Sequence, residues 1–307
     1  MARPVIIDCD PGVDDAIALL LALSTDQLNI LAITTVAGNV PLHYTTANAL
    51  KICELAGCPD VSIYPGCPRP ILRPLHTAAE VHGATGLQGA TLPEPSQAPQ
   101  TQHAVEYLVH TLSQAAEPIT LATLGPLTNV ALALIQQPCI AENIQEIVAM
   151  GGAVTHGNVT PSAEFNIYVD PHAAQVVLSA GIPTTLITLD TTHQVLTTAE
   201  RRQTIRDLGS PVAQAAADLL AHYGQADAER YGMPGSPLHD PCVLAYLMQP
   251  ELFTRRQVPV TVELDPGLSL GRTVVDWWHP DDGSMFVADG VNAEKFYDLL
   301  TRQLGTY

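Results

Sequence analysis

The sequence predicts an α/β fold in which a mostly parallel central sheet is flanked by helices. Two features of the 307-residue chain indicate this class. Short, continuous apolar runs alternate with segments of helical periodicity, which is the pattern of parallel strands covered on both faces. The segments that follow four of the predicted strands are also rich in Gly, Asn and Asp. Because open parallel sheets bind ligands beyond the carboxyl ends of their strands, these four ends also indicate where a site would lie.

The predicted strands are apolar runs that are too short for amphipathic helices. In the main sheet they cover residues 5–8, 29–36, 61–64, 119–124, 144–150 and 184–189. Three later runs predict a small antiparallel extension near the C-terminus, at residues 258–264, 272–277 and 285–287. The alternation continues along the chain without a break, so we expect a single domain over residues 1–307.

The predicted helices share apolar positions that recur every three or four residues. One example is residues 103–115, where positions 105, 108, 109 and 112 are apolar. The helices cover residues 14–24, 42–56, 103–115, 127–136, 171–180, 198–208, 212–221 and 292–304, and another is expected after Asp240. Two segments lack the pattern: residues 65–99 contain seven prolines, and residues 223–237 contain three glycines and two prolines. Such segments are either binding loops or plain surface excursions.

The composition excludes several classes of partner. Lys and Arg number 13 against 31 Asp and Glu, which gives a formal net charge of −18 at pH 7. Nucleic acids and phosphorylated substrates require basic surfaces, so they are disfavoured and a neutral or cationic small molecule is favoured. The longest apolar run, residues 16–23, is too short to span a bilayer, and no signal peptide is apparent. The six cysteines form no CxxC pair, which fits buried thiols in a reducing cytoplasm.

The most informative stretch is DCDPGVDD at residues 8–15, between the first predicted strand and the first helix. It brings together four carboxylates, Asp8, Asp10, Asp14 and Asp15, which repel one another unless a proton or a cation lies among them. Asp14 and Asp15 could simply cap the helix, where backbone dipoles favour anions. A cap needs only one acid, however, and clustered carboxylate oxygens suit Ca²⁺ or Mg²⁺. The spacing is not that of an EF-hand.

Two other stretches carry candidate site residues. His239 and Asp240 stand where a loop meets a predicted helix, and Asp240 alone could be a helix cap. Asn158, Glu164 and Asn166 are polar residues in a segment with apolar anchors. Carboxamides and carboxylates can grip sugar hydroxyls through directional hydrogen bonds, although the same residues also form ordinary turns.

Six blocks of the chain, in order, resemble the nucleoside hydrolase family, the inosine–uridine-preferring nucleoside N-ribohydrolases. They are DCDPGVDD at residues 8–15, AGN at 37–39, GPLTN at 125–129, MGG at 150–152, EFN at 164–166 and HDP at 239–241. The resemblance extends from residue 5 to about residue 300. Within the family, VHG at residues 81–83 followed by GL at 86–87 looks closest to the bacterial pyrimidine-preferring ribonucleoside hydrolases.

The resemblance implies the nucleoside hydrolase fold and a Ca²⁺ ion at the floor of the pocket. The implied metal ligands are all oxygens, from the carboxylates of Asp10, Asp15 and Asp240 and the backbone carbonyl of Leu124. Asp14 would be the general base that acts on a water molecule, and Asn39 would help to orient that water and the ribose. The family also implies a cytoplasmic homotetramer that acts in nucleoside catabolism and salvage.

The same resemblance assigns the substrate-binding residues. On the sugar side they are Met150 beneath the ribose, with Asn158, Glu164, Phe165 and Asn166 around its hydroxyls. On the base side, His239 would be the leaving-group acid, with His82 and Tyr231 as neighbours. Histidine ordinarily titrates near neutral pH, which suits an acid. The implied reaction is hydrolysis of the N-glycosidic bond of uridine or cytidine, with inversion at C1′.

Three alternatives remain open. Within the family, the chain could be a broad-specificity inosine–uridine hydrolase. Outside it, Asp8 and Asp10 could belong to a haloacid-dehalogenase-like phosphatase with Mg²⁺, although no lysine follows a Gly-rich loop. A non-catalytic sugar or nucleoside receptor is the third alternative. Ribose release from a nucleoside, without phosphate release from a phosphomonoester, would separate them.

Overall fold

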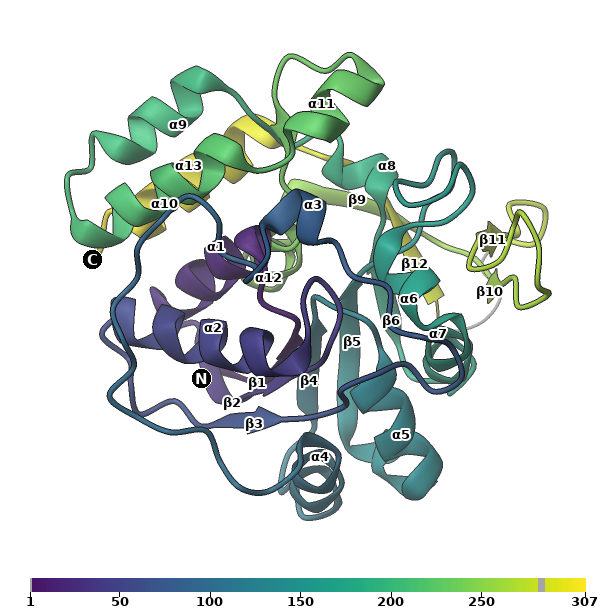
Figure 1. The fold of residues 1–307 in the computed structure, drawn as a ribbon. Coiled ribbons are helices and arrows are strands. Elements are labelled where there is room, and N and C mark those ends of the chain that lie inside the picture. Colours follow the sequence, from purple (N-terminus) through teal and green to yellow (C-terminus); the bar gives the residue numbers. More distant parts are fainter. Residues whose placement is uncertain (1, 281–284) are drawn as a thin grey trace.

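The computed structural model describes residues 2–280 and 285–307, except for the side chains at positions 222, 226 and 227. Its central feature is a sheet that is covered by helices on both faces (Figure 1). The strands in this sheet lie in the order β3-β2-β1-β4-β5-β6-β12-β9. Their bounds are β1 Arg3–Cys9, β2 Leu28–Thr35, β3 Ile63–Pro65, β4 Ile119–Thr123, β5 Ile144–Met150, β6 Thr184–Ile187, β9 Phe253–Gln257 and β12 Met285–Val291. All neighbouring pairs are parallel except β12 with β9, so the predicted α/β fold is confirmed.

Two hydrophobic cores lie on opposite faces of the sheet. Alternate residues of β1 enter different cores, since Val5 and Ile7 join one cluster and Ile6 the other. The helices that cover the first face are α1 Val13–Leu23, α2 Leu42–Leu55, α10 Pro211–His222, α12 Pro241–Met248 and α13 Ala293–Leu304. Those that cover the second are α4 Ala104–Ser113, α5 Thr128–Gln136 and α7 Pro171–Leu178. A further helix, α9 Ala199–Arg206, packs on α10 and α13.

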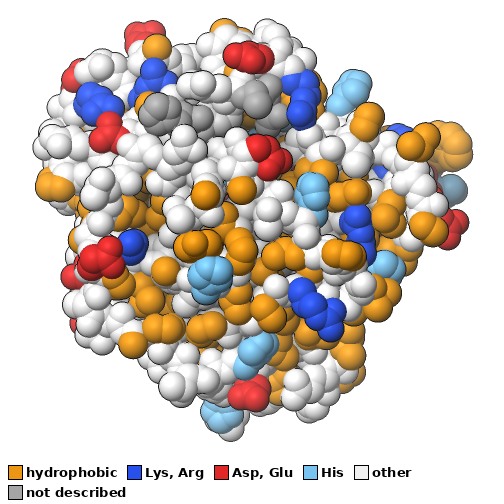
Figure 2. Space-filling view, in the orientation of Figure 1, with side chains coloured by type: hydrophobic (Ala, Val, Ile, Leu, Met, Phe, Trp, Pro, Cys, Tyr) orange, Lys and Arg blue, Asp and Glu red, His pale blue; other side chains and the backbone are white. Residues whose placement is uncertain are grey.

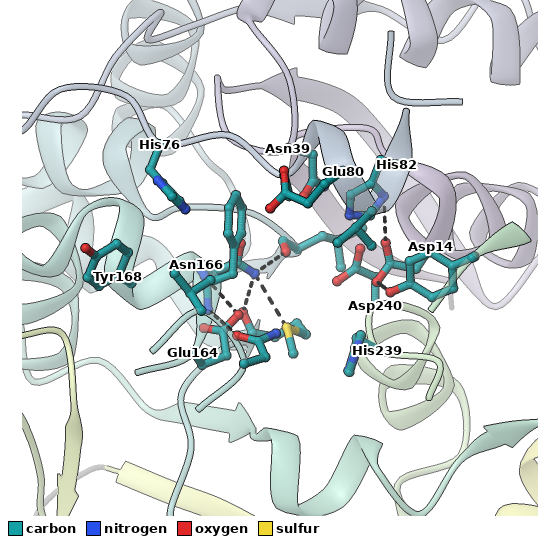
Figure 3. Close-up of a pocket in the computed structure, with 18 of the residues that line it drawn as sticks. Asp14, Asn39, His76, Glu80, His82, Glu164, Asn166, Tyr168, His239 and Asp240 are labelled. Carbon is teal, nitrogen blue, oxygen red and sulfur yellow. Dashed lines mark hydrogen bonds and ion pairs between the residues drawn. The ribbon is translucent and has the colours of Figure 1, made fainter. Parts of the chain in front are cut away.

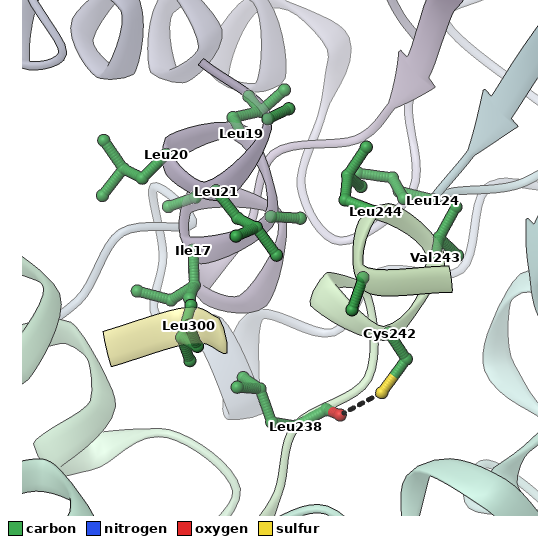
Figure 4. Packing of buried hydrophobic residues seen from close by; sticks show 14 of the residues in the cluster. Ile17, Leu19, Leu20, Leu21, Leu124, Leu238, Cys242, Val243, Leu244 and Leu300 are labelled. Atoms are coloured by element: carbon green, nitrogen blue, oxygen red, sulfur yellow. Dashed lines mark hydrogen bonds between the residues drawn. The ribbon is translucent and has the colours of Figure 1, made fainter. Parts of the chain in front are cut away.

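Helix α1 is buried on nearly all sides. Ile17, Leu19, Leu20 and Leu21 are each 0% exposed and pack close to α12 and to Leu300 of α13 (Figure 4). A helix that is apolar all round belongs in a protein interior, which fixes its position firmly. The first turn of α1 carries the acidic stretch, so this packing also fixes the carboxylates of the site.

The predicted antiparallel extension is confirmed for two of its three strands. Strands β10 Val260–Val262 and β11 Thr273–Val275 pair antiparallel beside the main sheet. The third run, at residues 285–287, lies elsewhere: β12 joins the main sheet, parallel to β6 and antiparallel to β9. Strand β9 was not predicted because its sequence, FTRRQ, is polar and largely exposed.

Short elements occupy the two segments that lacked a pattern. Helix α3 Ala79–His82 lies in the first, and α11 Gln225–Tyr231 in the second. The sequence also did not predict α6 Phe165–Val169 and α8 Leu189–Thr192, or a small antiparallel pair, β7 Leu196–Thr197 and β8 Ser236–Pro237. Within the described ranges, no helix is both long and apolar enough to cross a membrane.

Candidate active site

A cavity of about 460 Å³ opens beyond the carboxyl ends of the central strands. Figure 2 shows hydrophobic and histidine side chains gathered across the middle of this face, and Figure 3 shows the lining residues. Most of the predicted site residues line this cavity: Asp14, Asn39, His82, Leu124, Met150, Asn158, Glu164, Phe165, Asn166, His239 and Asp240. Asp10 and Asp15 are buried beside them.

The turn between β1 and α1 fixes the carboxylate of Asp15. The carboxylate accepts hydrogen bonds from the backbone N–H groups of Asp10, at 3.2 Å, and Gly12, at 2.9 Å. Asn39 donates a third from its side chain, at 3.1 Å. This is the capping arrangement that the sequence suggested as the alternative to metal binding, and it accounts for Asp15 only in part.

Asp10 lies in a space that only glycines leave open. The backbone N–H of Asn39 donates to its Oδ2 at 2.7 Å, whereas Oδ1 is buried without a hydrogen-bond partner among the described residues. A Cβ atom on Gly38 would lie 2.1 Å from Oδ2, and one on Gly125 would lie 2.2 Å from Oδ1. Because Gly38 and Gly125 have no side chain, the backbone of the AGN and GPLTN blocks can lie against this carboxylate, and a larger residue would not fit at either position.

An acidic group suited to a metal ion lies at the base of the cavity. One carboxylate oxygen from each of Asp14, Asp15 and Asp240 lies within 4.8 Å of the others, and all three residues are buried. Asp14 Oδ1, like Asp10 Oδ1, is buried and unpartnered within the described part of the chain. Asp10, which the resemblance named as a ligand, is outside this group of three. Unsatisfied buried carboxylate oxygens are costly unless a cation or a proton compensates them, so the donor set fits a hard divalent cation.

Burial and mutual repulsion disfavour the charged forms of these carboxyls and raise their pKa values. Burial raises the pKa of Asp15 to about 7, and the charge of Asp14 adds to the effect. Burial also raises the pKa values of Asp10 and Asp240 well above the ordinary range, with neighbouring carboxylates adding to it. Oxygens of Asp15 and Asp240 lie within 4.8 Å of each other, so their negative charges repel unless a proton or a cation lies between them. A bound cation would remove that repulsion and keep both carboxyls deprotonated.

Asp14 is held by one oxygen, and its other oxygen has no hydrogen-bond partner among the described residues. The hydroxyl of Tyr223, at the end of α10, donates to Oδ2 at 2.6 Å. Oδ1 lies 3.9 Å from Nδ1 of His82, which itself accepts the backbone N–H of Val13 at 3.0 Å. Burial lowers the pKa of His82, so its ring is neutral with the proton on Nε2. The sequence did not indicate Tyr223, which lies at the edge of an irregular segment.

His239 is buried at the other wall of the cavity, close to His193 and Tyr223. Its Nδ1 lies 2.7 Å from the hydroxyl of Thr192 in α8, and the His193 ring centroid lies 5.9 Å from its own. Burial lowers the pKa of His239 to about 4. Burial works against the near-neutral titration expected for this histidine, because a buried imidazole loses the hydration that favours its charged form.

The sugar-side residues of the prediction are tied to backbone groups. Glu164 accepts the N–H groups of Gly152, Asn166 and Ile167, at distances of 2.9, 2.8 and 3.1 Å. Its burial raises its pKa to about 7. Asn166 donates to the carbonyl oxygen of Leu124 at 2.6 Å and to that of Met150 at 3.1 Å. These contacts fix the cavity floor rigidly, as a preorganised site requires.

Two other predicted residues have structural partners of their own. Asn158 accepts the N–H of Phe165 at 2.9 Å. The hydroxyl of Tyr231 donates to the carbonyl of Gly157 at 2.6 Å, and its ring packs on His193 at 4.9 Å between centroids. Tyr231 is outside the set of described residues that line the cavity.

Asp8, which would be the nucleophile in the phosphatase alternative, supports the strands beneath the site. Its Oδ1 accepts from Thr34 at 2.5 Å and from Asn129 at 2.8 Å. Asn129 also donates to the carbonyl of Thr35 and accepts the N–H of Cys67. The asparagine of the GPLTN block thus ties β1, β2 and the first irregular segment together.

The irregular segments contribute to the site rather than forming plain surface. His76, Glu80 and His82 come from the first, and Tyr223 and Arg230 from the second; all line the cavity. His76 lies edge-on to Tyr168 at 5.6 Å between ring centroids, at the end of the cavity away from Asp14 (Figure 3). Both segments therefore line the cavity, as the binding-loop interpretation predicts.

Comparison with known proteins gives a consistent result. The sequence matches the family model described as "Inosine-uridine preferring nucleoside hydrolase" over residues 5–298. The pyrimidine-specific ribonucleoside hydrolase RihA of Shewanella woodyi is 46% identical over 310 residues, covering 100% of this chain and 99% of that protein. An uncharacterized protein of Schizosaccharomyces pombe is 45% identical over 306 residues, covering 98% of each chain. The solved purine-preferring ribonucleoside hydrolase of Gardnerella vaginalis has a TM-score of 0.92 and 32% identity, covering 99% of this chain and 98% of that one. The description of the Shewanella woodyi protein names pyrimidines, whereas that of the Gardnerella vaginalis protein names purines.

Proposed function

The chain belongs to the inosine-uridine preferring nucleoside hydrolase family, and we propose that it hydrolyses pyrimidine ribonucleosides in a calcium-dependent reaction. The products are ribose and free uracil or cytosine. The observation that carries the proposal is the pair of carboxylate oxygens on Asp14: Tyr223 holds Oδ2, and Oδ1 is buried and unpartnered beside the acidic group within the described chain. A receptor that only binds a nucleoside has no use for such an oxygen.

The proposed calcium ligands are Asp10, Asp15 and Asp240, with the backbone carbonyl of Leu124. Two findings support this set: Oδ1 of Asp10 is buried and lacks a partner among the described residues, and oxygens of Asp15 and Asp240 lie within 4.8 Å of each other. The carbonyl of Leu124 already accepts from Asn166, and its second lone pair stays available. When bound, a calcium ion supplies positive charge that lowers the pKa of a nearby water and orients it.

Asp14 is proposed as the general base. Its Oδ1 accepts a proton from the attacking water, whose oxygen forms the new bond to C1′. The bond from C1′ to the base nitrogen breaks and its electron pair leaves with the base, which then takes up a proton from solvent, to which Asp14 later releases its own. Positive charge that builds on the ribose is stabilised by the buried carboxylates, as in other glycoside hydrolyses. Because water attacks the face opposite the leaving base, the configuration at C1′ inverts. Asn39 holds Asp10 and Asp15 in place during the step.

The remaining predicted residues are proposed to hold the two ends of the nucleoside. Met150, Asn158, Glu164, Phe165 and Asn166 would surround the ribose, and the backbone contacts that fix them support this role. His239, with His82 and Tyr231 as neighbours, would face the base. A neutral His239 stabilises negative charge on the leaving base as a hydrogen-bond donor rather than by releasing a proton from a charged ring.

The preference for pyrimidines is supported by the description of the Shewanella woodyi relative, at 46% identity. The alternative, a broad-specificity inosine–uridine hydrolase, is supported by the purine-preferring structural neighbour at 32% identity. A rate series on uridine, cytidine, inosine and adenosine, with release of ribose as the readout, decides between them. We expect uridine and cytidine to have the highest kcat/KM. Comparable values for inosine would favour the alternative.

A phosphomonoester added to the substrate series, together with a measurement of nucleoside binding, tests the more distant alternatives. A haloacid-dehalogenase-like phosphatase would release phosphate from a phosphomonoester, and a receptor would bind nucleoside without turnover. We expect neither outcome. The homotetramer and the cytoplasmic role in nucleoside salvage are also part of the proposal, and light scattering of the purified chain tests the first.

A further inference from the structure

Thr192 and His239 meet across the wall of the cavity, although they come from different elements. The hydroxyl oxygen of Thr192 lies 2.7 Å from Nδ1 of His239. Thr192 is 0% exposed and His239 is 6% exposed, so water does not compete for this contact. We propose that Thr192 is a positioning residue: its hydroxyl holds Nδ1 of His239 as an acceptor and thereby leaves Nε2–H as a donor to the departing base. The inference rests on the proposed hydrolase function and deepens it.

Both partners stand on firmly anchored backbone. The N–H of Leu189, at the start of α8, bonds the carbonyl of Gly152 at 3.0 Å, and Asp190 accepts the N–H of Val154 at 2.7 Å. On the other side, the carbonyl of His239 accepts the N–H of Cys242 in the first turn of α12. A hydrogen bond between two anchored elements sets the orientation of a ring, because neither end can move away.

The Thr192 hydroxyl has two contacts of different length. The Thr192 hydroxyl has one other acceptor nearby, the carbonyl oxygen of Leu189, at 3.5 Å. That is the outer limit for an O–H donor, whereas 2.7 Å to Nδ1 is the usual length. In the proposed arrangement the hydroxyl donates to Nδ1, its shorter contact, and Nδ1 then carries no proton. A neutral imidazole carries one N–H, so the proton is on Nε2.

In this arrangement the Nε2–H group of His239 is the ring donor left for a ligand in the cavity. His239 lines the cavity, and its ring lies edge-on to Tyr223 at 6.4 Å and close to His193 at 5.9 Å. With Nδ1 taken by Thr192, Nε2 is the ring atom left for a ligand. A fixed donor aimed at a leaving base stabilises the charge that develops there without any proton leaving the ring. The opposite tautomer would present a lone pair to that charge and repel it.

Thr191 provides a matched control. It is the neighbouring residue in α8 and is equally buried at 0% exposure, but its hydroxyl donates to the carbonyl of Ala288 at 2.7 Å. Replacing either threonine by valine keeps the shape of the side chain and removes one buried hydrogen bond. The two variants should therefore lose similar stability, and only Thr192→Val should disturb His239.

The experiment compares two substrates, uridine and 4-nitrophenyl riboside, whose leaving group departs unaided. We expect Thr192→Val to lower kcat on uridine by about 10-fold or more, in the range typical of a lost catalytic hydrogen bond, and to change kcat on the nitrophenyl substrate by less than about 3-fold. Thr192→Ser should restore the uridine rate, because it keeps the hydroxyl. Thr191→Val should leave the ratio of the two rates unchanged. In a His239→Ala background, Thr192→Val should have no further effect on that ratio.

The outcomes separate the inference from the function on which it rests. Equal losses on both substrates, or no loss on uridine, would overturn the positioning role and leave the hydrolase function intact. A parent enzyme that cleaves neither substrate would overturn the proposed function, and the inference with it. If Thr192→Val does not fold, Thr192→Ala replaces it in the same comparison, since that variant also lacks the hydroxyl.

Discussion

The hydroxyl of Tyr223 donates a 2.6 Å hydrogen bond to Oδ2 of Asp14, between residues 209 positions apart in the chain. Both side chains are buried, and the other oxygen of Asp14 has no hydrogen-bond partner in the described part of the protein. The tyrosine thus selects which carboxylate oxygen is left for the substrate side. This division of one carboxylate into a held oxygen and an available oxygen is what a general base requires: a fixed orientation and an unused lone pair.

Tyr223→Phe should therefore lower kcat without removing the metal. A hydrogen bond to a charged group contributes about 1.5–3 kcal/mol, so we expect a loss of roughly 10- to 100-fold in kcat. Calcium affinity, measured by titration calorimetry, should change little, because Tyr223 holds Asp14, which is not among the proposed calcium ligands. A variant with full activity would show that the orientation of Asp14 does not depend on this contact.

Asp10 and Asp14 should differ in what their replacement removes. Asp10→Ala takes away a proposed metal ligand, so we expect both calcium binding and turnover to be lost. Asp14→Asn keeps a side chain of the same shape but cannot accept the proton, so most of the metal affinity should remain while uridine hydrolysis is lost. Calorimetry and ribose release measured on the same preparations check both statements.

The position of Asp14 in the acidic group makes this comparison sharp. Its carboxylate lies with those of Asp15 and Asp240 within 4.8 Å, and Asp10 is outside that group. If Asp14→Asn abolished metal binding while Asp10→Ala preserved it, the metal would be bound by Asp14, Asp15 and Asp240, and another residue would have to be the base. Near-parental activity of Asp14→Asn would rule it out as the base directly.

The local part of the site could be predicted from sequence, and the distant part could not. The acids of residues 8–15 are brought together by one strand, one turn and one helix, so their spacing alone indicates a cation site. The contacts of Tyr223 with Asp14 and of Thr192 with His239 join residues 209 and 47 positions apart, and no local pattern records them. They depend on how α10 and α8 pack.

The same reasoning explains the errors in the fold. Strands β1, β2, β4 and β5 are buried, so their apolar runs predict them well. Helices α3, α6, α8 and α11 are four to seven residues long, too short to show a period, and caps and tertiary contacts define them instead. Strand β12 was placed in the wrong sheet because its neighbour β9 is polar and gave no signal.

The metal-free protein should lose stability as the pH rises. Burial raises the pKa values of Asp15 and Glu164 to about 7 and that of Asp8 to about 6. A carboxyl whose pKa is raised in the folded state binds its proton more tightly there than in the unfolded chain. Its contribution to stability is therefore complete below the unfolded pKa, near 4, and is lost as the pH rises through about 7.

Thermal unfolding in the presence of a chelator tests this, with Tm falling between pH 5 and pH 8. Calcium should raise Tm strongly at pH 8 and weakly at pH 5, because it binds only the deprotonated carboxylates. Magnesium at the same concentration is the control for ion selectivity. A calcium-induced shift of the same size at both pH values would mean that the metal is bound somewhere other than the buried acids.

Substrates altered at the ribose should report on the pocket floor. Loss of the 2′-hydroxyl would leave buried polar groups unpaired, at a cost of about 1–3 kcal/mol for each group, so 2′-deoxyuridine should be cleaved at least about 10-fold more slowly than uridine. Uridine 5′-monophosphate should also be poor, because the chain carries a net charge of −18 and Glu164 lies in the cavity. Comparable kcat/KM values for uridine and its 5′-monophosphate would contradict this arrangement.

Glu164 should be more sensitive to replacement by Gln than its position on the sugar side suggests. Its two oxygens accept three backbone N–H groups, from Gly152, Asn166 and Ile167. A glutamine has one acceptor oxygen and would direct an NH₂ group at one or two of those donors. At least one buried N–H would lose its partner, which typically costs about 1–3 kcal/mol.

We expect Glu164→Gln to lower Tm and to raise KM for uridine, since the helical turn that presents Asn166 would shift. Metal affinity should not change, because Glu164 is outside the acidic group of the site. Steady-state kinetics, thermal unfolding and calcium titration on one preparation separate these effects. If Tm and KM both stay at parental values, the three N–H contacts do not define the ribose side of the cavity.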